Sequence, residues 1–330
     1  MIITKTPFRI SFCGGGSDLK AFYEHQEGCV VSATVNKYMY ISIHPYFDPA
    51  RISLKYSETE LVDRPDKIEH RILREVLKEY DVTGLEITST ADIPAGTGLG
   101  SSSSFTVGLL HALDIYTGKH PDKADIADHA CDIEINRVGS PIGKQDQYAA
   151  AFGGLNYIRF LPDGNTIVEP IRIDQTLLPV LDRRLLMFFT GKMHDANRIL
   201  TEQKANIKQE QKADGLRLMC NYARQLKQTL EEGNLDSLGA LLHKNWLIKK
   251  TMACGITDPQ IDAIYETALQ HGAKGGKLLG AGGGGFLLFY CEEERQDELR
   301  KALGLREMIF HLEQDGTTMI FQDQASGWKE

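Results

Sequence analysis

Residues 94–105, PAGTGLGSSSSF, combine a glycine-rich loop with four consecutive serines. Glycine lets backbone N–H groups approach a ligand closely. The loop follows a predicted strand, residues 85–94, and leads into Phe105, Leu109 and Leu113, which have helical spacing. Serine is a favoured N-cap, so the serines are expected to cap this helix. A strand, a glycine loop and a helix N-terminus in this order predict a site for an anion such as phosphate.

Two further segments of the chain are rich in glycine, CGGGSD at residues 13–18 and LLGAGGGG at residues 278–285. One such segment alone is more simply a tight turn, whereas three together predict a phosphate-rich ligand approached from several sides. The chain has no G-x-x-x-x-G-K-[ST], and its 94–104 loop does not fit G-x-G-x-x-G, so two common phosphate motifs are excluded there. The signatures of eukaryotic-type protein kinases are also missing.

Charged residues lie within, beside or between these segments at four places: Arg9 in TPFRISF, Asp18 in CGGGSD, Glu134 in a predicted helix and Asp146 in GKQDQYAAAFGG. Three of these residues have simple structural explanations. Arg9 could be a surface cation at a strand edge, Glu134 a solvated helix carboxylate, and Asp146 a capping residue.

The composition is that of an ordinary globular enzyme, with 330 residues, 42% hydrophobic and 25% charged. The net charge of −8 argues against a nucleic-acid partner, because such proteins are more often basic. Six scattered cysteines without a CxxC pair predict reduced thiols in the cytoplasm. We see no signal peptide and no apolar run of the ~18 residues that would span a membrane.

Mixed helical and strand-like patterns must position these residues. Helices are predicted over residues 66–80, from Pro121 to Gly139, and repeatedly between residues 195 and 271. Hairpins are predicted around Asp163-Gly164 and over residues 308–322, and a buried strand over 183–190. The expected domains are residues 1–183 and 184–330.

Three segments in chain order, TPFRISFCGGGSD, PAGTGLGSSSS and KLLGAGGGGF, resemble the motifs of the GHMP kinase superfamily. This superfamily includes galactokinases, homoserine kinases, mevalonate kinases and phosphomevalonate kinases. The resemblance covers nearly the whole chain. It implies an α+β fold of two domains, the first like domain 2 of ribosomal protein S5 and the second ferredoxin-like, with the active site between them. It also implies an ATP-dependent phosphotransferase that acts on an alcohol group and uses Mg²⁺.

The resemblance also implies roles for individual residues. Asp146 would accept the proton of the attacking hydroxyl, and Arg9 would stabilise the transferring charge. Ser102 and Glu134 would hold Mg²⁺. Backbone amides, the helix dipole, serine hydroxyls and Mg²⁺ would replace the absent lysine around ATP. The residues implied to bind ATP are Pro94, Gly96, Gly98, Leu99, Gly100, Ser101, Ser102, Ser103 and Ser104.

The acceptor is implied by the GGGSD form of the first motif, which differs from the galactokinase form. Together with GKQDQYAAAFGG and HKNWLIKK, it is similar to bacterial D-glycero-D-manno-heptose 7-phosphate kinases and to the kinase domain of L-fucokinase. A 7-phosphate needs cations, for which Lys192, Arg198, Lys249 and Lys250 are candidates, although Lys249 and Lys250 could also form a solvated helix face. His194 stands where an arginine is common in the family. The residues implied to bind the acceptor are Gly14, Gly15, Gly16, Ser17, Asp18, Gly282, Gly283, Lys192, His194, Arg198 and Lys249.

We therefore expect a cytoplasmic kinase whose partners are ATP and a small sugar phosphate, with no nucleic acid and no membrane. The expected reaction phosphorylates the C1 hydroxyl of heptose 7-phosphate to the 1,7-bisphosphate, in nucleotide-activated heptose biosynthesis for surface polysaccharide. Two alternatives are an L-fucokinase-like kinase of an unphosphorylated sugar and a non-catalytic sensor of sugars or nucleotides. The sequence predicts neither the anomer nor the oligomeric state.

Overall fold

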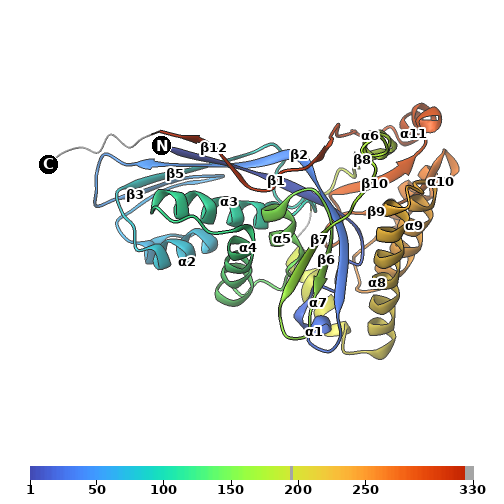
Figure 1. Ribbon diagram of the computed structural model, residues 1–330, viewed down its shortest axis with the longest axis horizontal. Coiled ribbons are helices and arrows are strands. Elements are labelled where there is room, and N and C mark those ends of the chain that lie inside the picture. Colours follow the sequence, from blue (N-terminus) through green and yellow to red (C-terminus); the bar gives the residue numbers. More distant parts are fainter. Residues whose placement is uncertain (194–195, 324–330) are drawn as a thin grey trace.

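The computed structural model describes residues 1–193 and 196–323 (Figure 1). The larger of its two sheets contains the strands β1 (Ile2–Cys13), β2 (Gly28–Pro45), β3 (Ile52–Lys55), β4 (Thr59–Val62), β5 (Leu85–Ala91), β6 (Leu155–Phe160), β7 (Thr166–Pro170), β11 (Leu312–Glu313) and β12 (Thr318–Gln322). The strand order is β12-β1-β2-β5-β3-β4, while β6 and β11 also pair with β2 and β7 pairs with β6. The long strands β1 and β2 therefore form the centre of this sheet.

Helices of the N-terminal half cover one face of this sheet (Figure 1). They are α2 (Arg71–Tyr80), α3 (Ser101–Tyr116), α4 (Lys123–Cys131) and α5 (Gln145–Phe152), while the short α1 (Lys20–Tyr23) follows β1. The helix α3 packs on β1 and β2 with one side and on α4 and α5 with another, which explains why it is apolar around most of its circumference. Gly108 permits this close approach, because a Cβ there would lie 2.7 Å from the hydroxyl of Thr6 on β1.

The second sheet is antiparallel with the order β8-β10-β9. Its strands are β8 (Leu185–Phe189), β9 (Ala273–Leu278) and β10 (Phe286–Cys291). The helices of this half are α6 (Leu178–Arg184), α7 (Ala196–Asn206), α8 (Glu210–Glu231), α9 (Asp236–Lys249), α10 (Pro259–Gln270) and α11 (Gln296–Leu303). Helix α9 packs on β9, and α8 contacts both α9 and β2, so α8 joins the two halves of the molecule.

Several elements agree with the patterns in the sequence. The hairpin around Asp163-Gly164 is formed by β6 and β7, and β8 is the strand expected within residues 183–190. The helix predicted from Pro121 to Gly139 begins as α4 at Lys123 and continues as a π-helical segment, Asp132–Arg137. Asp122 caps it by accepting a hydrogen bond from the backbone N–H of Asp125 at 2.8 Å. Among the described helices, none is both long and apolar enough to cross a membrane.

The predicted hairpin over residues 308–322 is wrong. Strand β11 pairs with β2, and β12 pairs with the edge of β1, so the two strands do not pair with each other. An alternating pattern indicates a strand but not its partner, and the free edge of β1 offers unpaired N–H and C=O groups. The boundary between residues 183 and 184 falls just before β8, but it assigns β11 and β12 to the second domain, whereas both belong to the first sheet.

Candidate active site

All three glycine segments of the sequence line one cavity of about 310 Å³ between the two halves of the molecule. Helices α5, α7 and α9 contribute further lining residues. The lining residues from the glycine segments are Gly15, Gly16, Asp18, Gly96, Gly98, Gly100, Ser101, Ser102, Ser103, Gly280 and Ala281. The structure therefore brings together segments that lie more than 260 residues apart in the sequence: Gly15 and Gly280 are the first glycine and the last glycine of this lining.

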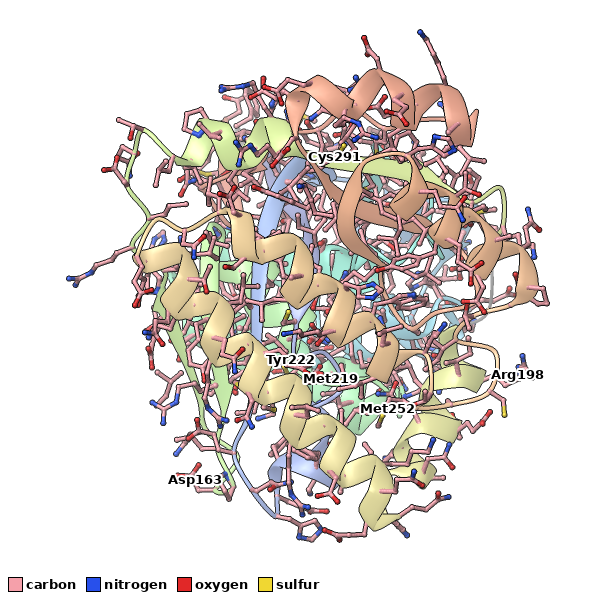
Figure 2. The ribbon with its side chains drawn as sticks, turned by 90° about the vertical axis from the view of Figure 1, so that its right-hand side faces the viewer. Asp163, Arg198, Met219, Tyr222, Met252 and Cys291 are labelled. Carbon is pink, nitrogen blue, oxygen red and sulfur yellow. The ribbon has the colours of Figure 1, made fainter. Side chains whose placement is uncertain are left out.

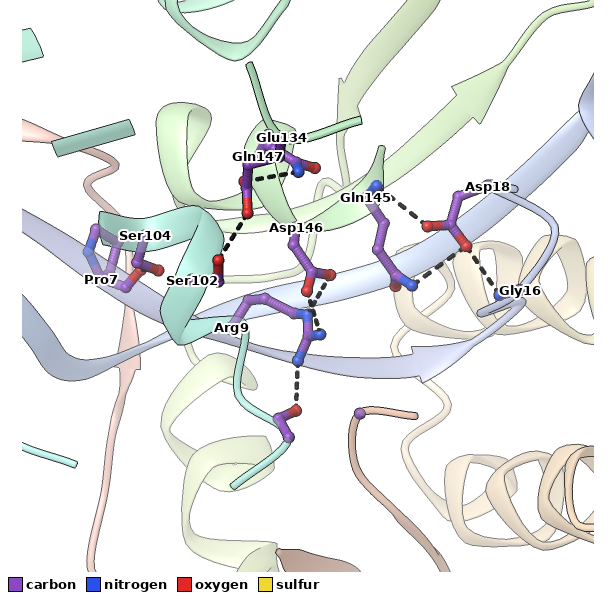
Figure 3. A network of polar contacts seen from close by, with 12 residues as sticks. Pro7, Arg9, Gly16, Asp18, Ser102, Ser104, Glu134, Gln145, Asp146 and Gln147 are labelled. Carbon is purple, nitrogen blue, oxygen red and sulfur yellow. Dashed lines mark hydrogen bonds and ion pairs between the residues drawn. The ribbon is translucent and has the colours of Figure 1, made fainter. Parts of the chain in front are cut away.

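Asp146 and Arg9 form an ion pair in this cavity (Figure 3). The Arg9 Nε donates to Oδ1 of Asp146 at 2.8 Å, and Nη2 donates to Oδ2 at 2.6 Å. The third guanidinium nitrogen donates to the carbonyl of Gly98 at 2.7 Å, and Arg9 is 4% exposed. Arg9 is thus not a surface cation. It joins β1 to the second glycine segment and to the first turn of α5, where Asp146 lies.

Glu134 is a buried carboxylate, 1% exposed, on the π-helical segment. It accepts hydrogen bonds from Ser102 Oγ at 2.7 Å and from Gln147 Nε2 at 2.9 Å (Figure 3). Burial raises the pKa of Glu134 to about 7, and the hydrogen bonds from Ser102 and Gln147 oppose this rise. A solvated helix carboxylate is therefore excluded.

Ser102, Glu134 and Asp146 line the same cavity with oxygen atoms, which are the ligands that Mg²⁺ prefers. Within the described chain, no group of three or more His, Cys, Asp or Glu side chains could hold a metal ion. A magnesium ion here would consequently depend on few protein oxygens and take its remaining ligands from water and phosphate, which is its usual behaviour beside nucleotides.

The N-terminus of α3 carries no side-chain cap. Gly100 is the N-cap, in a left-handed conformation with φ 76°, so the expected serine cap is wrong. The serines lie inside the helix instead, where Ser104 donates to the carbonyl of Pro7 at 2.8 Å and Ser102 donates to Glu134. Because no side chain occupies it, this helix end can offer its first N–H groups and the positive end of its dipole to a phosphate.

The second and third glycine segments touch through their backbones. A Cβ at Gly98 would lie 2.6 Å from the carbonyl oxygen of Leu279, and a Cβ at Gly280 would overlap with Gly98. Gly282 and Gly283 do not line the cavity: a Cβ at Gly282 would lie 2.6 Å from the Cα of Ile256, and Gly283 donates to the carbonyl of Ile256. Close backbone packing explains these glycines of the third segment.

The first glycine segment is divided between packing and the cavity. A Cβ at Gly14 would overlap with the carbonyl of Cys29. The hydroxyl of Ser17 donates a hydrogen bond to the Cys29 carbonyl and accepts one from the Cys29 N–H. Gly15, Gly16 and Asp18 face the cavity. Asp18 accepts hydrogen bonds from Gly16 N at 2.8 Å and from the side chain of Gln145 at 3.2 Å (Figure 3). Burial and the nearby Asp146 raise the pKa of Asp18.

Four cations were predicted to bind the acceptor phosphate: Lys192, Arg198, Lys249 and Lys250. Of these described residues, Lys249 alone lines the cavity. It is 6% exposed, and its Nζ donates to the carbonyls of Leu278, at 3.2 Å, and Gly280. Burial and the nearby cations Lys277 and Arg9 lower the pKa of Lys249.

The other predicted cations lie elsewhere. Lys192 pairs with Asp258 at 2.5 Å, and Lys250 pairs with Asp262 at 3.5 Å. Arg198 is exposed on α7, at the edge of the molecule in Figure 2. His194 lies outside the described residues.

Several polar residues near the cavity were not singled out in the sequence. Ser11, Gln145 and Gln203 line it, and the buried Lys277 donates to the carbonyl of Phe12, at 3.0 Å, just before the first glycine segment. Two of them adjoin recognisable motifs, Gln145 beside Asp146 and Lys277 at the start of KLLGAGGGGF, and this proximity was a usable signal. No sequence signal distinguishes Gln203 from the other polar residues of its helix.

A second cavity, of about 580 Å³, lies beside the second glycine segment. Pro94 and Thr97 line it together with Phe189 and Phe286 of the C-terminal sheet. Gly96, Gly98 and Gly100 line the first cavity, so this loop borders both cavities.

Two family descriptions match the chain, "GHMP kinases N terminal domain" over residues 67–154 and "GHMP kinases C terminal" over residues 226–308. The D-glycero-alpha-D-manno-heptose 7-phosphate kinase of Campylobacter jejuni is 29% identical, with 92% of this chain and 93% of the relative covered. The galactokinase of Thermotoga maritima is 23% identical, with 93% and 96% covered. The bifunctional fucokinase/GDP-fucose pyrophosphorylase of Arabidopsis thaliana is 24% identical over 90% of this chain, but only 30% of that longer protein is covered.

Solved structures show the same fold. A D-glycero-D-manno-heptose 1-phosphate kinase from Bacteroides thetaiotaomicron superposes with a TM-score of 0.81 at 25% identity, covering 98% of this chain and 100% of that one. The mevalonate kinase of Methanococcus jannaschii superposes with a TM-score of 0.69 at 20% identity, covering 94% and 98%. The two-part architecture therefore belongs to a known fold.

Proposed function

The chain belongs to the GHMP kinase family and is an ATP-dependent sugar kinase, and from this premise we propose that it phosphorylates the C1 hydroxyl of D-glycero-D-manno-heptose 7-phosphate. The observation that carries the chemistry is the ion pair between the buried Arg9 and the partly exposed Asp146, in a cavity lined by all three glycine segments. The observation that supports the acceptor is the similarity to the heptose 7-phosphate kinase of Campylobacter jejuni along nearly all of both chains.

ATP would lie along the loop at residues 94–104. The uncapped N-terminus of α3 would hold the triphosphate through backbone N–H groups. The second cavity would bind the adenine base of ATP, because Phe189 and Phe286 offer aromatic surface on the far side of the same loop. Ser102 and Glu134 would hold Mg²⁺, which supplies positive charge that neutralises the phosphate oxygens.

Asp146 would accept the proton of the attacking C1 hydroxyl. Its carboxylate is fixed by two hydrogen bonds from Arg9, and each carboxylate oxygen retains capacity to accept another bond. Arg9 would stabilise the negative charge that develops near it during transfer. Arg9 also donates to the carbonyl of Gly98. The same side chain would therefore hold the loop at residues 94–104 and the proton acceptor Asp146 at a fixed separation.

Lys249 would bind the phosphate that the acceptor carries away from C1. Two of its three donors are used by the carbonyls of Leu278 and Gly280, and the side chain lines the cavity. Unlike Arg9, it has no carboxylate partner among the described residues. A buried ammonium group with a remaining donor is suited to an anion.

The product would be heptose 1,7-bisphosphate, an intermediate for nucleotide-activated heptose and surface polysaccharide, formed in the cytoplasm where ATP is available. An L-fucokinase-like activity is the second candidate, because the L-fucokinase/L-fucose-1-P guanylyltransferase of Bacteroides fragilis is 24% identical over 88% of this chain, which spans 34% of that longer protein. A non-catalytic sensor is disfavoured, since it has no need of an Arg9–Asp146 ion pair in the same cavity as the buried Glu134.

An acceptor screen tests the proposal. ADP release is measured with Mg-ATP and, separately, heptose 7-phosphate, mannose 6-phosphate, L-fucose, galactose or mevalonate. The proposal predicts the highest kcat/KM with heptose 7-phosphate. A clear preference for L-fucose would refute heptose 7-phosphate as the acceptor but leave the kinase activity standing. No ADP release with any sugar would favour the non-catalytic sensor.

A further inference from the structure

Two buried polar atoms beside the first glycine segment have no hydrogen-bond partner in the described part of the chain. They are Oγ of Ser11 and Oε1 of Gln145, and both residues line the main cavity. Ser11 is 5% exposed and lies near the end of β1. Buried polar groups are nearly always satisfied, so two unsatisfied atoms at one end of a cavity indicate where a ligand supplies the missing bonds.

The orientation of the Gln145 amide is set by Asp18. Gln145 Nε2 donates to Oδ1 of Asp18 at 3.2 Å (Figure 3). An ionised carboxylate has no donor, so the amide must turn its nitrogen toward Asp18. The amide oxygen, Oε1, therefore remains available to accept a hydrogen bond from a ligand. Both unsatisfied atoms lie close to Gly15, since a Cβ there would be 3.5 Å from the Ser11 hydroxyl and 3.8 Å from Gln145 Oε1. Glycine at this position keeps the space between them open.

Gln203 approaches the same place from the other half of the molecule. It lies on α7, is 3% exposed and lines the cavity. Its side-chain nitrogen packs over Gly16, where a Cβ would overlap with it. Gly16 in turn donates its backbone N–H to Asp18 at 2.8 Å. No hydrogen bond of the Gln203 amide to another described residue accounts for its burial.

We propose that Ser11, Gln145 and Gln203 extend the acceptor site beside Asp18, where they bind hydroxyl groups of the sugar and set which sugar is accepted. This inference rests on the proposed sugar kinase activity. The four groups comprise a hydroxyl, two amides and a carboxylate, so they offer both donors and acceptors and no positive charge. Such a set matches sugar hydroxyls, each of which can donate and accept, and it does not match a phosphate. The phosphate of the acceptor is left to Lys249, a cation that lines the same cavity.

The first test replaces Ser11 with alanine, which removes one oxygen and little volume. Ser32 provides a matched control, since it pairs with Ser11 across β1 and β2, is buried and also has an unpartnered hydroxyl, but does not line the cavity. Ser11→Ala is expected to raise the acceptor KM about tenfold, the effect of losing roughly one hydrogen bond, while the KM for ATP stays within twofold. Ser32→Ala is expected to leave both constants unchanged. Equal effects of the two substitutions would overturn the proposal.

The second test uses Gln203→Leu, with Lys204→Gln as the control on the exposed side of the same helix. The kcat/KM values are measured for the sugar that the wild type accepts and for its deoxy analogues. Wild type should discriminate against at least one analogue about tenfold, and Gln203→Leu should lose that discrimination at one position only, whereas Lys204→Gln should keep it. A purely structural role would lower all values together and would contradict the proposal.

Both tests use whichever sugar the wild-type enzyme phosphorylates. Failure of heptose 7-phosphate as the acceptor would therefore refute the proposed substrate without refuting the subsite. Conversely, unchanged acceptor KM values in Ser11→Ala and unchanged discrimination in Gln203→Leu would refute the subsite in an enzyme of any sugar specificity.

Discussion

The guanidinium of Arg9 faces the carboxylate of Asp146 in a two-pronged ion pair, with Nε–Oδ1 and Nη2–Oδ2 distances of 2.8 and 2.6 Å. The two residues stand 137 positions apart in the chain. A planar guanidinium and a planar carboxylate fix each other's orientation when both bonds form. Asp146 is thereby held at a defined place beside Gly100 at the N-terminus of α3, where the proposed reaction needs a proton acceptor.

Replacing Asp146 with asparagine should lower kcat by about 10²–10⁴-fold, because general-base contributions have this size. Binding of ATP should persist, since the uncapped helix end and Ser102 are unchanged. ADP release gives kcat, and calorimetric titration gives the ATP affinity. Asp163→Asn, in the exposed turn between β6 and β7, serves as the control. Wild-type turnover in Asp146→Asn would remove this residue from the mechanism.

Replacing Glu134 with alanine should raise the Mg²⁺ concentration needed for half-maximal rate, because the buried carboxylate bonded to Ser102 would be lost from the metal site. The rate is measured across a Mg²⁺ titration at saturating ATP. Asp132 offers a matched control on the same π-helical segment, since it pairs with Arg137 outside the cavity. An identical Mg²⁺ dependence in Glu134→Ala and Asp132→Ala would mean that Glu134 has no role in holding the metal.

Lys249 and its neighbour Lys250 allow a test of the acceptor phosphate. Wild type should prefer heptose 7-phosphate over free heptose by at least tenfold in kcat/KM, because a charged hydrogen bond contributes about 1.5–3 kcal/mol. Lys249→Met should remove most of this preference. Lys250→Met should retain it, since Lys250 pairs with Asp262 and does not line the cavity. Near-equal values for the two sugars in the wild type would refute an acceptor phosphate site.

The backbone contact between the second and third glycine segments should make Gly98 intolerant of alanine. A Cβ there would lie 2.6 Å from the carbonyl of Leu279. Gly118 has a similar φ, 78° against 85°, but no atom lies within 4 Å of its Cβ position, so Gly118→Ala isolates the backbone strain of about 1–2 kcal/mol.

Gly98→Ala should lower the free energy of unfolding further than Gly118→Ala does and should also raise the KM for ATP. Denaturant unfolding and initial-rate kinetics measure the two effects. If the two variants lost equal stability and kept the same KM for ATP, the contact between the segments would have no role in holding the nucleotide.

Local features of this protein were readable in the sequence because they depend on neighbouring residues. The strand, loop and helix around residues 94–104 follow from glycine content and the spacing of Phe105 and Leu109, and the turn at Asp163-Gly164 follows from its residue types. The helix N-cap was missed because a left-handed glycine, Gly100, replaced the serines that normally take this role.

Long-range partners were not readable in this way. Lys192, Lys249 and Lys250 look alike as basic residues, yet Asp258 and Asp262 pair with two of them at the surface while the third enters the cavity. Gln203 is recognised as a site residue only in the folded structure, where its side chain packs over Gly16. A one-dimensional pattern records the type of each side chain but not the carboxylate or glycine that meets it.

The position of the transferred phosphate on the product shows directly whether the C1 hydroxyl of the sugar is the acceptor. Heptose 7-phosphate is incubated with Mg-ATP and the enzyme, and the product is examined by phosphorus NMR with correlation to protons. Phosphorylation of the C1 hydroxyl would give a second phosphate signal coupled to the anomeric proton, and this signal should be absent with Asp146→Asn. A second phosphate coupled to any other proton of the sugar, or no second phosphate at all, would contradict a kinase of the C1 hydroxyl of this sugar.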